Sequence, residues 1–213
     1  MALVHRATLE PSKQELVEVW LPSRHWAGGA GIAQDVAQKV AQKVAEYRFD
    51  DPAGEVGVET ILWRTGEGAL LQTPLTYRAE PLENAEEFLI GTSDHSVLGR
   101  RWVYDGCGDP VWAAALATAI LTGGSQAQTV IEHDGELVDV PARMQVRGSG
   151  SAGADVPAIS TVESACDDGP VTTVTAGSLT ISLVRIVGTP VEGAATLTGS
   201  IGDEDLGVLA ALR

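Results

Sequence analysis

The sequence has little positive charge. Fourteen lysines and arginines stand against 29 aspartates and glutamates, which gives the 213 residues a formal net charge of −15. Proteins that bind nucleic acid or anionic lipid need the opposite balance, because they neutralise phosphates. No apolar run approaches the roughly 20 residues of a membrane-spanning helix, and residues 1–6 are too short and polar to open a secretory signal. We therefore expect a cytoplasmic protein that binds neither nucleic acid nor membranes.

Lysine and cysteine are also scarce. The only lysines are Lys13, Lys39 and Lys43, so arginine is the only strong cation available to any chemistry beyond residue 43. The two cysteines, Cys107 and Cys166, lie far apart in the sequence and form neither a disulfide framework nor a structural zinc site. No motif indicates a cofactor or a metal, and we predict none.

Large aromatic residues are few, whereas glycine is abundant. Two phenylalanines and three tyrosines accompany 24 glycines, and such a chain is typical of short strands separated by turns. Hairpin-length turns and the lack of helical crossovers between strands favour antiparallel pairing. The predicted fold class is α+β, mostly antiparallel β-sheets with a few helices. We place a boundary near Ser125, which divides the chain into an α+β unit, residues 1–125, and a nearly all-β unit, residues 126–213.

Local signals predict the elements of the first unit. Ser12 and Glu15 form a capping box, and the helix that they open runs to residue 21. A glycine-rich loop at 27–31 leads to a predicted helix over 34–44, where valines recur every four residues, and a strand follows over 44–49. Residues 55–64 and 69–78 flank a glycine-bearing turn and predict a hairpin.

A third helix is predicted over 111–121. Asp109 is its N-cap, Pro110 stands at its first position, and Gly123 follows its end. Its surface is apolar nearly all round, which indicates burial on most sides. Strands are predicted on both sides of this helix, at these residues: 90–92, 101–105, 129–131, 136–138, 143–147, 171–175, 179–187, 195–201 and 208–212.

Residues 148–153 match the spacing G-x-G-x-x-G, which lets backbone N–H groups approach a phosphate. In dinucleotide-binding folds that motif opens a helix, but here Pro157 follows closely and opposes one. We interpret the segment as a flexible linker. Whether this glycine loop binds a phosphate is left open.

Cys107 is a candidate nucleophile. It stands before a helix N-terminus, where a thiolate is favoured, and His95 with Asp105 or Asp109 would complete a base and an orienting carboxylate. The sequence does not establish that these residues meet. Packing of a small residue in a tight turn is the favoured interpretation of Cys107.

The segment around Trp26 is the best candidate for a binding surface. Arg24, His25 and Trp26 lie beside glycines, and together they offer a cation, an imidazole and an indole for stacking and hydrogen bonding. We name these three residues and His95 as candidate partner- or ligand-binding residues. The alternative is that Trp26 fills the core, since tryptophan is usually buried.

Two segments carry a resemblance to a known family. Residues 20–29 read WLPSRHWAGG, and residues 91–110 read GTSDHSVLGRRWVYDGCGDP. They resemble the N-terminal cap region of actinobacterial maltokinases and related aminosugar (glucosamine) kinases, in which an L-P-x-x-R-W-x-x-G segment precedes a hairpin and a V-Y-D-x-x-x-D-P segment starts a helix. His25 is an insertion relative to the first pattern. The resemblance extends over about residues 12–123 and implies a cap-like domain at residues 1–125.

Kinases with this cap continue into two catalytic lobes, and several parts of those lobes have no counterpart here. Phosphoryl transfer needs a lysine on the nucleotide phosphates, a catalytic Asp and ligands for magnesium. No lysine follows Lys43, and no H-x-D loop or D-F-G-like segment occurs. The β-rich residues 126–213 would then be a shortened counterpart of the kinases' intermediate subdomain. We expect a stand-alone protein that is not an enzyme.

The resemblance implies a place in α-glucan, maltose and trehalose metabolism. The favoured function is a non-catalytic accessory or regulatory interaction partner of a protein in that metabolism, because caps of such kinases are thought to govern contacts with partner enzymes. Two alternatives stay open: a module that binds a small sugar or phosphosugar, and a degenerate sugar kinase N-lobe with residual nucleotide binding. A glucan-active barrel needs about 250 residues and is excluded by size.

Overall fold

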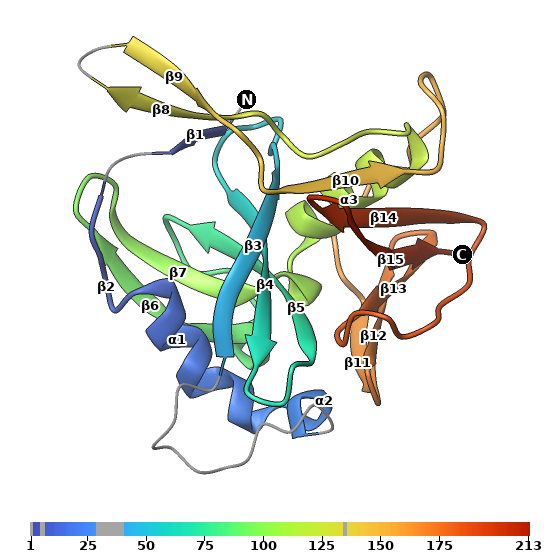
Figure 1. The fold of residues 1–213 in the computed structure, drawn as a ribbon, viewed down its shortest axis with the longest axis horizontal. Helices are drawn as coiled ribbons and strands as arrows, with labels where there is room; N and C mark the ends of the chain where they lie inside the picture. Colours follow the sequence, from blue (N-terminus) through green and yellow to red (C-terminus); the bar gives the residue numbers. More distant parts are fainter. Residues whose placement is uncertain (1, 5–6, 29–40, 134–135) are drawn as a thin grey trace.

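The computed structural model describes residues 2–4, 7–28, 41–133 and 136–213. Two six-stranded sheets and a three-stranded sheet form the framework of this part of the chain (Figure 1). All strand pairs in the described residues are antiparallel, apart from one pair that involves the N-terminal strand. The predicted α+β class with mostly antiparallel sheets is confirmed.

The first sheet contains the predicted hairpin. In spatial order its strands are β2 (Leu9–Glu10), β6 (Leu89–His95), β7 (Gly99–Asp105), β5 (Leu70–Arg78), β4 (Gly57–Thr65) and β3 (Ala41–Phe49). The predicted helix over 34–44 is wrong at residues 41–44, which belong to β3, and residues 34–40 lie outside the described residues. Val44 coincides with an irregularity in the pairing of β3 with β4. Its branched side chain suits a strand as well as a helix face, so the spacing of valines was ambiguous.

The second sheet is built from the C-terminal part of the chain. Its strands, in spatial order, are β10 (Met144–Gly148), β14 (Ala195–Ile201), β15 (Glu204–Leu212), β13 (Leu179–Val184), β12 (Val171–Ala176) and β11 (Ser164–Asp168). Strand β11 was not predicted, because it is an edge strand of mostly polar, exposed residues with no alternating pattern. The third sheet joins β1 (Ala2–Val4), β8 (Thr129–His133) and β9 (Glu136–Val140), and β1 runs parallel to β8.

Two of the helices begin where the sequence predicts. The capping box before α1 (Lys13–Trp20) is formed: Glu15 N donates to Ser12 Oγ, and Ser12 N donates to Glu15 Oε2. Asp109 caps α3 (Pro110–Leu121). The predicted loop at 27–31 is wrong at residues 27 and 28, which belong to α2 (His25–Gly28), and residues 29–31 lie outside the described residues. Short 3₁₀ turns complete the set: η1 (Leu21–Ser23), η2 (Glu86–Phe88) and η3 (Gly106–Gly108).

Two hydrophobic clusters form the core. The larger one packs α3 between the two large sheets, and it joins Leu62 and Trp112 to Met144 and Leu209. The core therefore runs across the change of composition near Ser125. The smaller cluster lies between the first sheet and the N-terminal helices, and its members include these residues: Leu16, Trp20, Trp26, Trp63 and Leu71. No described helix is long and apolar enough to cross a membrane.

The glycine motif closes the C-terminus of α3, and its prediction as a flexible linker is wrong. Gly150 N donates to Ile120 O at 2.9 Å, and Ser151 N donates to Leu121 O at 3.0 Å, which satisfies two of the last carbonyls of the helix. Gly148 N and Ser149 N donate to Gly124 O and Thr196 O. A Cβ at position 148 or 150 would overlap a carbonyl oxygen of α3. Glycine is required here for close backbone approach rather than for flexibility.

The Gly150→Ala substitution should therefore lower the free energy of unfolding by about 1–3 kcal/mol, because the added methyl group has no space beside Leu121 O. Gly66→Ala is the matched control, since a Cβ at that position meets nothing within 4 Å. Urea unfolding of both variants measures the difference. Equal stability of the two variants would show that the motif does not pack on the helix.

Candidate functional site

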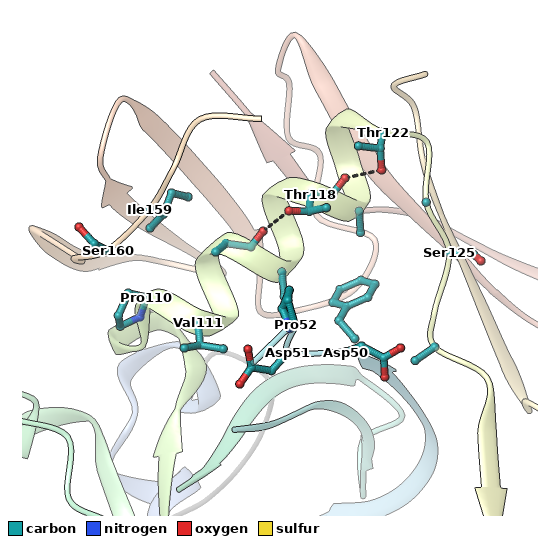
Figure 2. Close-up of a pocket in the computed structure, with 16 residues that line it drawn as sticks. Asp50, Asp51, Pro52, Pro110, Val111, Thr118, Thr122, Ser125, Ile159 and Ser160 are labelled. Carbon is teal, nitrogen blue, oxygen red and sulfur yellow. Dashed lines mark hydrogen bonds between the residues drawn. The ribbon is translucent and has the colours of Figure 1, made fainter. Parts of the chain in front are cut away.

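The solvent-facing side of α3 forms the floor of a groove of about 450 Å³ (Figure 2). The end of β3 and the turn that follows it, with Asp50, Asp51 and Pro52, lie on one side of the helix, and Ile159 and Ser160 lie on the other. The prediction that α3 is buried on most sides is confirmed, because Thr118 is its only exposed residue and the others are buried or half-buried. The groove lies along the side of the helix that does not face the core.

The groove has an apolar floor and a polar rim. Val111, Ala114 and Ile159 contribute apolar surface. The hydroxyl of Thr118 donates to Ala114 O, and the hydroxyl of Thr122 donates to Thr118 O, both at 2.7 Å. Each hydroxyl oxygen keeps acceptor capacity for a molecule in the groove. The surface suits apolar groups that are flanked by hydrogen-bond donors.

Carboxylates give one side of the groove negative charge. Asp51 accepts backbone hydrogen bonds from Ala53, Glu55 and Val56, which hold the turn after β3 in place. Asp50 precedes it in the same wall of the groove. None of the residues that line the groove is a cysteine, histidine, lysine or arginine. The groove therefore offers binding surface, with a preference for cations, and no nucleophile that is paired with a base.

A second cavity, of about 680 Å³, lies beside β10 and β14. Its lining is mostly polar and includes Gln145, Arg147, Ser200 and Asp205. No aromatic side chain lines it, so it lacks the flat apolar platform on which a sugar ring would stack. Neither this cavity nor the groove on α3 includes Trp26.

The structure buries Trp26 in the smaller core cluster, with 2% of its surface exposed. Its ring packs edge-on against Trp20, with the centroids 5.8 Å apart. Arg24 lies over the ring of Trp20 and bonds to the Ser23 hydroxyl, whereas the neighbouring His25 is exposed. Of the two interpretations of Trp26, the structure favours the one in which the indole fills the core.

His95 is the last residue of β6, and the turn between β6 and β7 lies well apart from α2 (Figure 1). Its Nδ1 accepts the backbone N–H of Val97 at 3.2 Å and that of Leu98 at 3.1 Å. These bonds shape the turn. The four candidate binding residues thus do not form one site, because His95 and the Arg24–Trp26 segment lie at different ends of the first sheet.

Cys107 and His95 are also separated. His95 pairs with Gly99 at the start of β7, and Cys107 follows the end of that strand, a separation of about 20 Å along an extended strand. Cys107 is fully buried, and burial raises the pKa of its thiol well above the ordinary value, although Arg185 acts in the opposite direction. Both Cys107 and Cys166 are free thiols. The predicted packing role of Cys107 is confirmed, and an activated thiol is not formed.

A buried ion pair connects Cys107 to the second sheet. Arg185 Nη2 donates to Asp105 Oδ2 at 2.6 Å and contacts the Cys107 sulfur at 3.2 Å. Its Nε donates to Thr172 Oγ1, and its guanidinium carbon lies 4.9 Å from the ring centroid of Trp26. Burial would lower the pKa of Arg185, but Asp105 outweighs it, so this pKa stays above the ordinary value. Asp105 is a structural counter-ion here.

The remaining residues of the V-Y-D-x-x-x-D-P segment are structural as well. Asp109 is fully buried, accepts the N–H of Val111 and receives both Nε and Nη2 of Arg78, at 2.7 and 2.6 Å. This bond raises the pKa of Arg78. The hydroxyl oxygen of Tyr104 accepts the N–H of Leu82. The segment positions η3 and the start of α3, and none of these polar groups faces a cavity described above.

Glu59 forms the centre of a second buried charge cluster. Its Oε2 accepts from Lys13 Nζ at 2.6 Å and from the Tyr77 hydroxyl at 2.7 Å, and its Oε1 accepts from Arg48 at 2.5 Å. Burial would raise the pKa of Glu59, but Lys13 and Arg48 outweigh it and hold this pKa well below the ordinary value. Lys13 is thus committed to fastening α1 to the first sheet. The described residues contain no group of three His, Cys, Asp or Glu side chains that could hold a metal ion.

Residues 20–109 match the family model of the maltokinase N-terminal cap domain. The match begins at the last residue of α1, ends at the N-cap of α3, and lies within the range over which the resemblance was predicted. It covers less than half of the chain. No curated protein matches the chain significantly. The resemblance of the first sheet and its flanking segments to the maltokinase cap is thereby confirmed.

Sequence reasoning did not find the groove. Its walls come from segments more than 100 residues apart, so no local pattern joins them. Thr118, the one exposed residue on an otherwise apolar helix, was the available signal.

The structural role of Trp26 can be measured directly. Trp26→Ala should cost about 3–5 kcal/mol of stability, as expected for a core tryptophan, whereas His25→Ala should change stability by less than about 0.5 kcal/mol because its side chain is exposed. Chemical denaturation of both variants tests this. A stable Trp26→Ala variant would restore the indole as a candidate for ligand recognition.

Glu59 should make stability depend on pH. Because its folded-state pKa is depressed, its contribution is complete above the unfolded-chain value of about 4.3 and is lost as the pH falls below it. Glu59→Gln should therefore cost about 3 kcal/mol at neutral pH, and the difference from the wild type should shrink as acid is added. Urea titrations from neutral to strongly acidic pH measure it, and a constant difference would contradict the cluster.

Proposed function

We propose that the chain is a non-catalytic, maltokinase cap-like protein that acts as an accessory or regulatory interaction partner in α-glucan, maltose and trehalose metabolism. The proposal rests on one observation: the aspartates of the segment that resembles the cap family form buried ion pairs that stabilise the fold. Asp105 pairs with Arg185, and Asp109 pairs with Arg78 and caps α3. A catalytic group has to reach its substrate, and these carboxylates are enclosed in the protein. The cap-like part thus acts through its shape and surface.

The groups that could bind nucleotide phosphates, a lysine and the backbone N–H groups of the glycine motif, are occupied within the protein. This supports a function without nucleotide binding or phosphoryl transfer. Lys13 is held by Glu59, and no lysine follows Lys43. In the glycine motif, the N–H groups of Gly148, Gly150 and Ser151 donate to backbone carbonyls instead of pointing to a phosphate. Phosphoryl transfer depends on such donors to hold the nucleotide. The degenerate-kinase alternative is therefore disfavoured.

The geometry around Trp26 weighs against the sugar-binding alternative. Burial of the indole removes the stacking surface for which that alternative was considered. The groove on α3 offers apolar side chains instead, framed by threonine hydroxyls and the carboxylates of Asp50 and Asp51. Such a surface is suited to side chains of a protein. On this basis we propose a protein as the partner, in preference to a sugar or a nucleotide.

Calorimetry distinguishes the three candidate functions: an accessory protein that binds another protein, a sugar-binding module and a degenerate kinase. Titration with magnesium-ATP, with maltose and with glucosamine should give no binding heat at micromolar protein, and incubation of ATP with either sugar should yield no phosphorylated product. Micromolar affinity for ATP would restore the degenerate-kinase class. Micromolar affinity for a sugar would favour the binding module.

The partner itself is identified by capture on the immobilised chain from the cytoplasm of its own cell, followed by reconstitution from purified components. We expect the captured protein to be an enzyme of α-glucan or trehalose metabolism, and we expect the purified enzyme to bind the purified chain. The Trp26→Ala variant, which is expected to be destabilised, serves as a negative control, and Gly66→Ala, in an exposed turn with room for a Cβ, serves as the positive control. Binding of sugars without any such enzyme would contradict the proposal.

A further inference from the structure

The turn between β6 and β7 is an exposed apolar tip. Val97 and Leu98 stand at its end with 58% and 46% of their surface accessible. Arg100 and Arg101 follow directly in β7. The tip thus combines two apolar side chains with two cations, in a chain whose net charge is −15.

The tip is held in a defined shape. His95 Nδ1 accepts the N–H groups of both Val97 and Leu98, and Ser96 exchanges two hydrogen bonds with Thr8. Gly99 closes the turn at φ +73°, a conformation that other residues rarely adopt. A surface fixed in advance loses little conformational entropy when it binds. This geometry favours recognition by insertion of the tip.

We propose that the tip of one copy docks into the α3 groove of a second copy of this chain. The apolar floor formed by Val111, Ala114 and Ile159 would cover the two apolar side chains of the tip. The tip would compete with the metabolic partner proposed above for this groove, but the self-association is measured on the purified chain alone and so stands or falls independently of that partner.

The charges of the two surfaces are complementary. Arg100 and Arg101 of the tip are cations, and Asp50 and Asp51 on the groove wall are anions. Arg100 pairs with Asp94 at 3.3 Å, but both side chains are more than 60% exposed. Exposed pairs of this kind contribute little energy, so Arg100 is able to exchange its partner. A second copy thus brings the required cations to the groove.

The tip and the groove lie on different parts of the molecule (Figure 1). The tip therefore does not reach the groove of its own copy, and a dimer held by one such contact retains an open groove on one copy and an open tip on the other. A contact between two unlike surfaces is heterologous, and it extends into chains or closes into rings. Because one hairpin turn buries little area, the association is weak and reversible.

Sedimentation velocity across the micromolar to millimolar range tests the proposal. The weight-average mass of the wild type should rise with concentration beyond that of a dimer. A tip variant, Val97→Glu with Leu98→Glu, and a groove variant, Ala114→Trp, should each lose at least about tenfold in association constant. Val19→Glu is the matched control, because Val19 is 82% exposed on α1, outside both surfaces.

Mixing the two variants is the decisive measurement. The tip variant keeps its groove and the groove variant keeps its tip, so together they should form a one-to-one pair that grows no further. Thr118→Arg replaces Ala114→Trp if circular dichroism shows that the latter is misfolded. A wild type that stays monomeric at millimolar concentration, or variants that fail to complement each other, would overturn the proposal.

Discussion

The buried arginine Arg185 connects the two large sheets, and the positions of several elements depend on it. Its guanidinium donates to Asp105 at the end of β7 and to Thr172 on β12, and it lies against the ring of Trp26. A buried cation without a partner costs several kcal/mol, so the fold is stable only while the counter-ion is in place. Backbone bonds add to this connection, because the carbonyl of Arg185 accepts the N–H of Gln72 on β5. The first sheet, the second sheet and α2 are thus fixed together.

The role of Asp105 as a counter-ion explains physically why a segment that resembles the cap family contains these carboxylates. Asp105 and Asp109, four residues apart, turn to different partners: the first neutralises Arg185, and the second neutralises Arg78 while it caps α3. Each carboxylate is both a counter-ion and an acceptor for backbone N–H groups at the start of η3 or α3. Residues 20–109 therefore match the cap family in segments that determine how the sheet ends and how the following helix starts. Similarity of that kind indicates a shared scaffold, and function has to be argued from the surface.

Those parts of the fold that depend on near neighbours were predictable from the sequence. The capping box joins Ser12 to Glu15, and Asp109 caps its helix through Val111, so both signals lie within four residues. The role of Gly150 was not predictable, because the carbonyl that it approaches belongs to Leu121. The ion pair at Arg185 spans 80 residues, and the groove joins segments that are further apart still. A glycine motif or a lone arginine has no local pattern that states which distant backbone it meets.

The small residues of α3 and its neighbours explain both the tight core and the open groove. On the inner side, the backbone carbonyls of Ala119 and Ile120 lie so close to the end of β10 that position 148 has no room for a Cβ. On the outer side, Ala114 leaves the helix surface low between the turn after β3 and Ile159. A helix of larger side chains would fill the groove and push the two sheets apart, since interiors are packed at nearly constant density. The small side chains along one helix thus allow the short distance between the sheets and leave the groove open on the outer side.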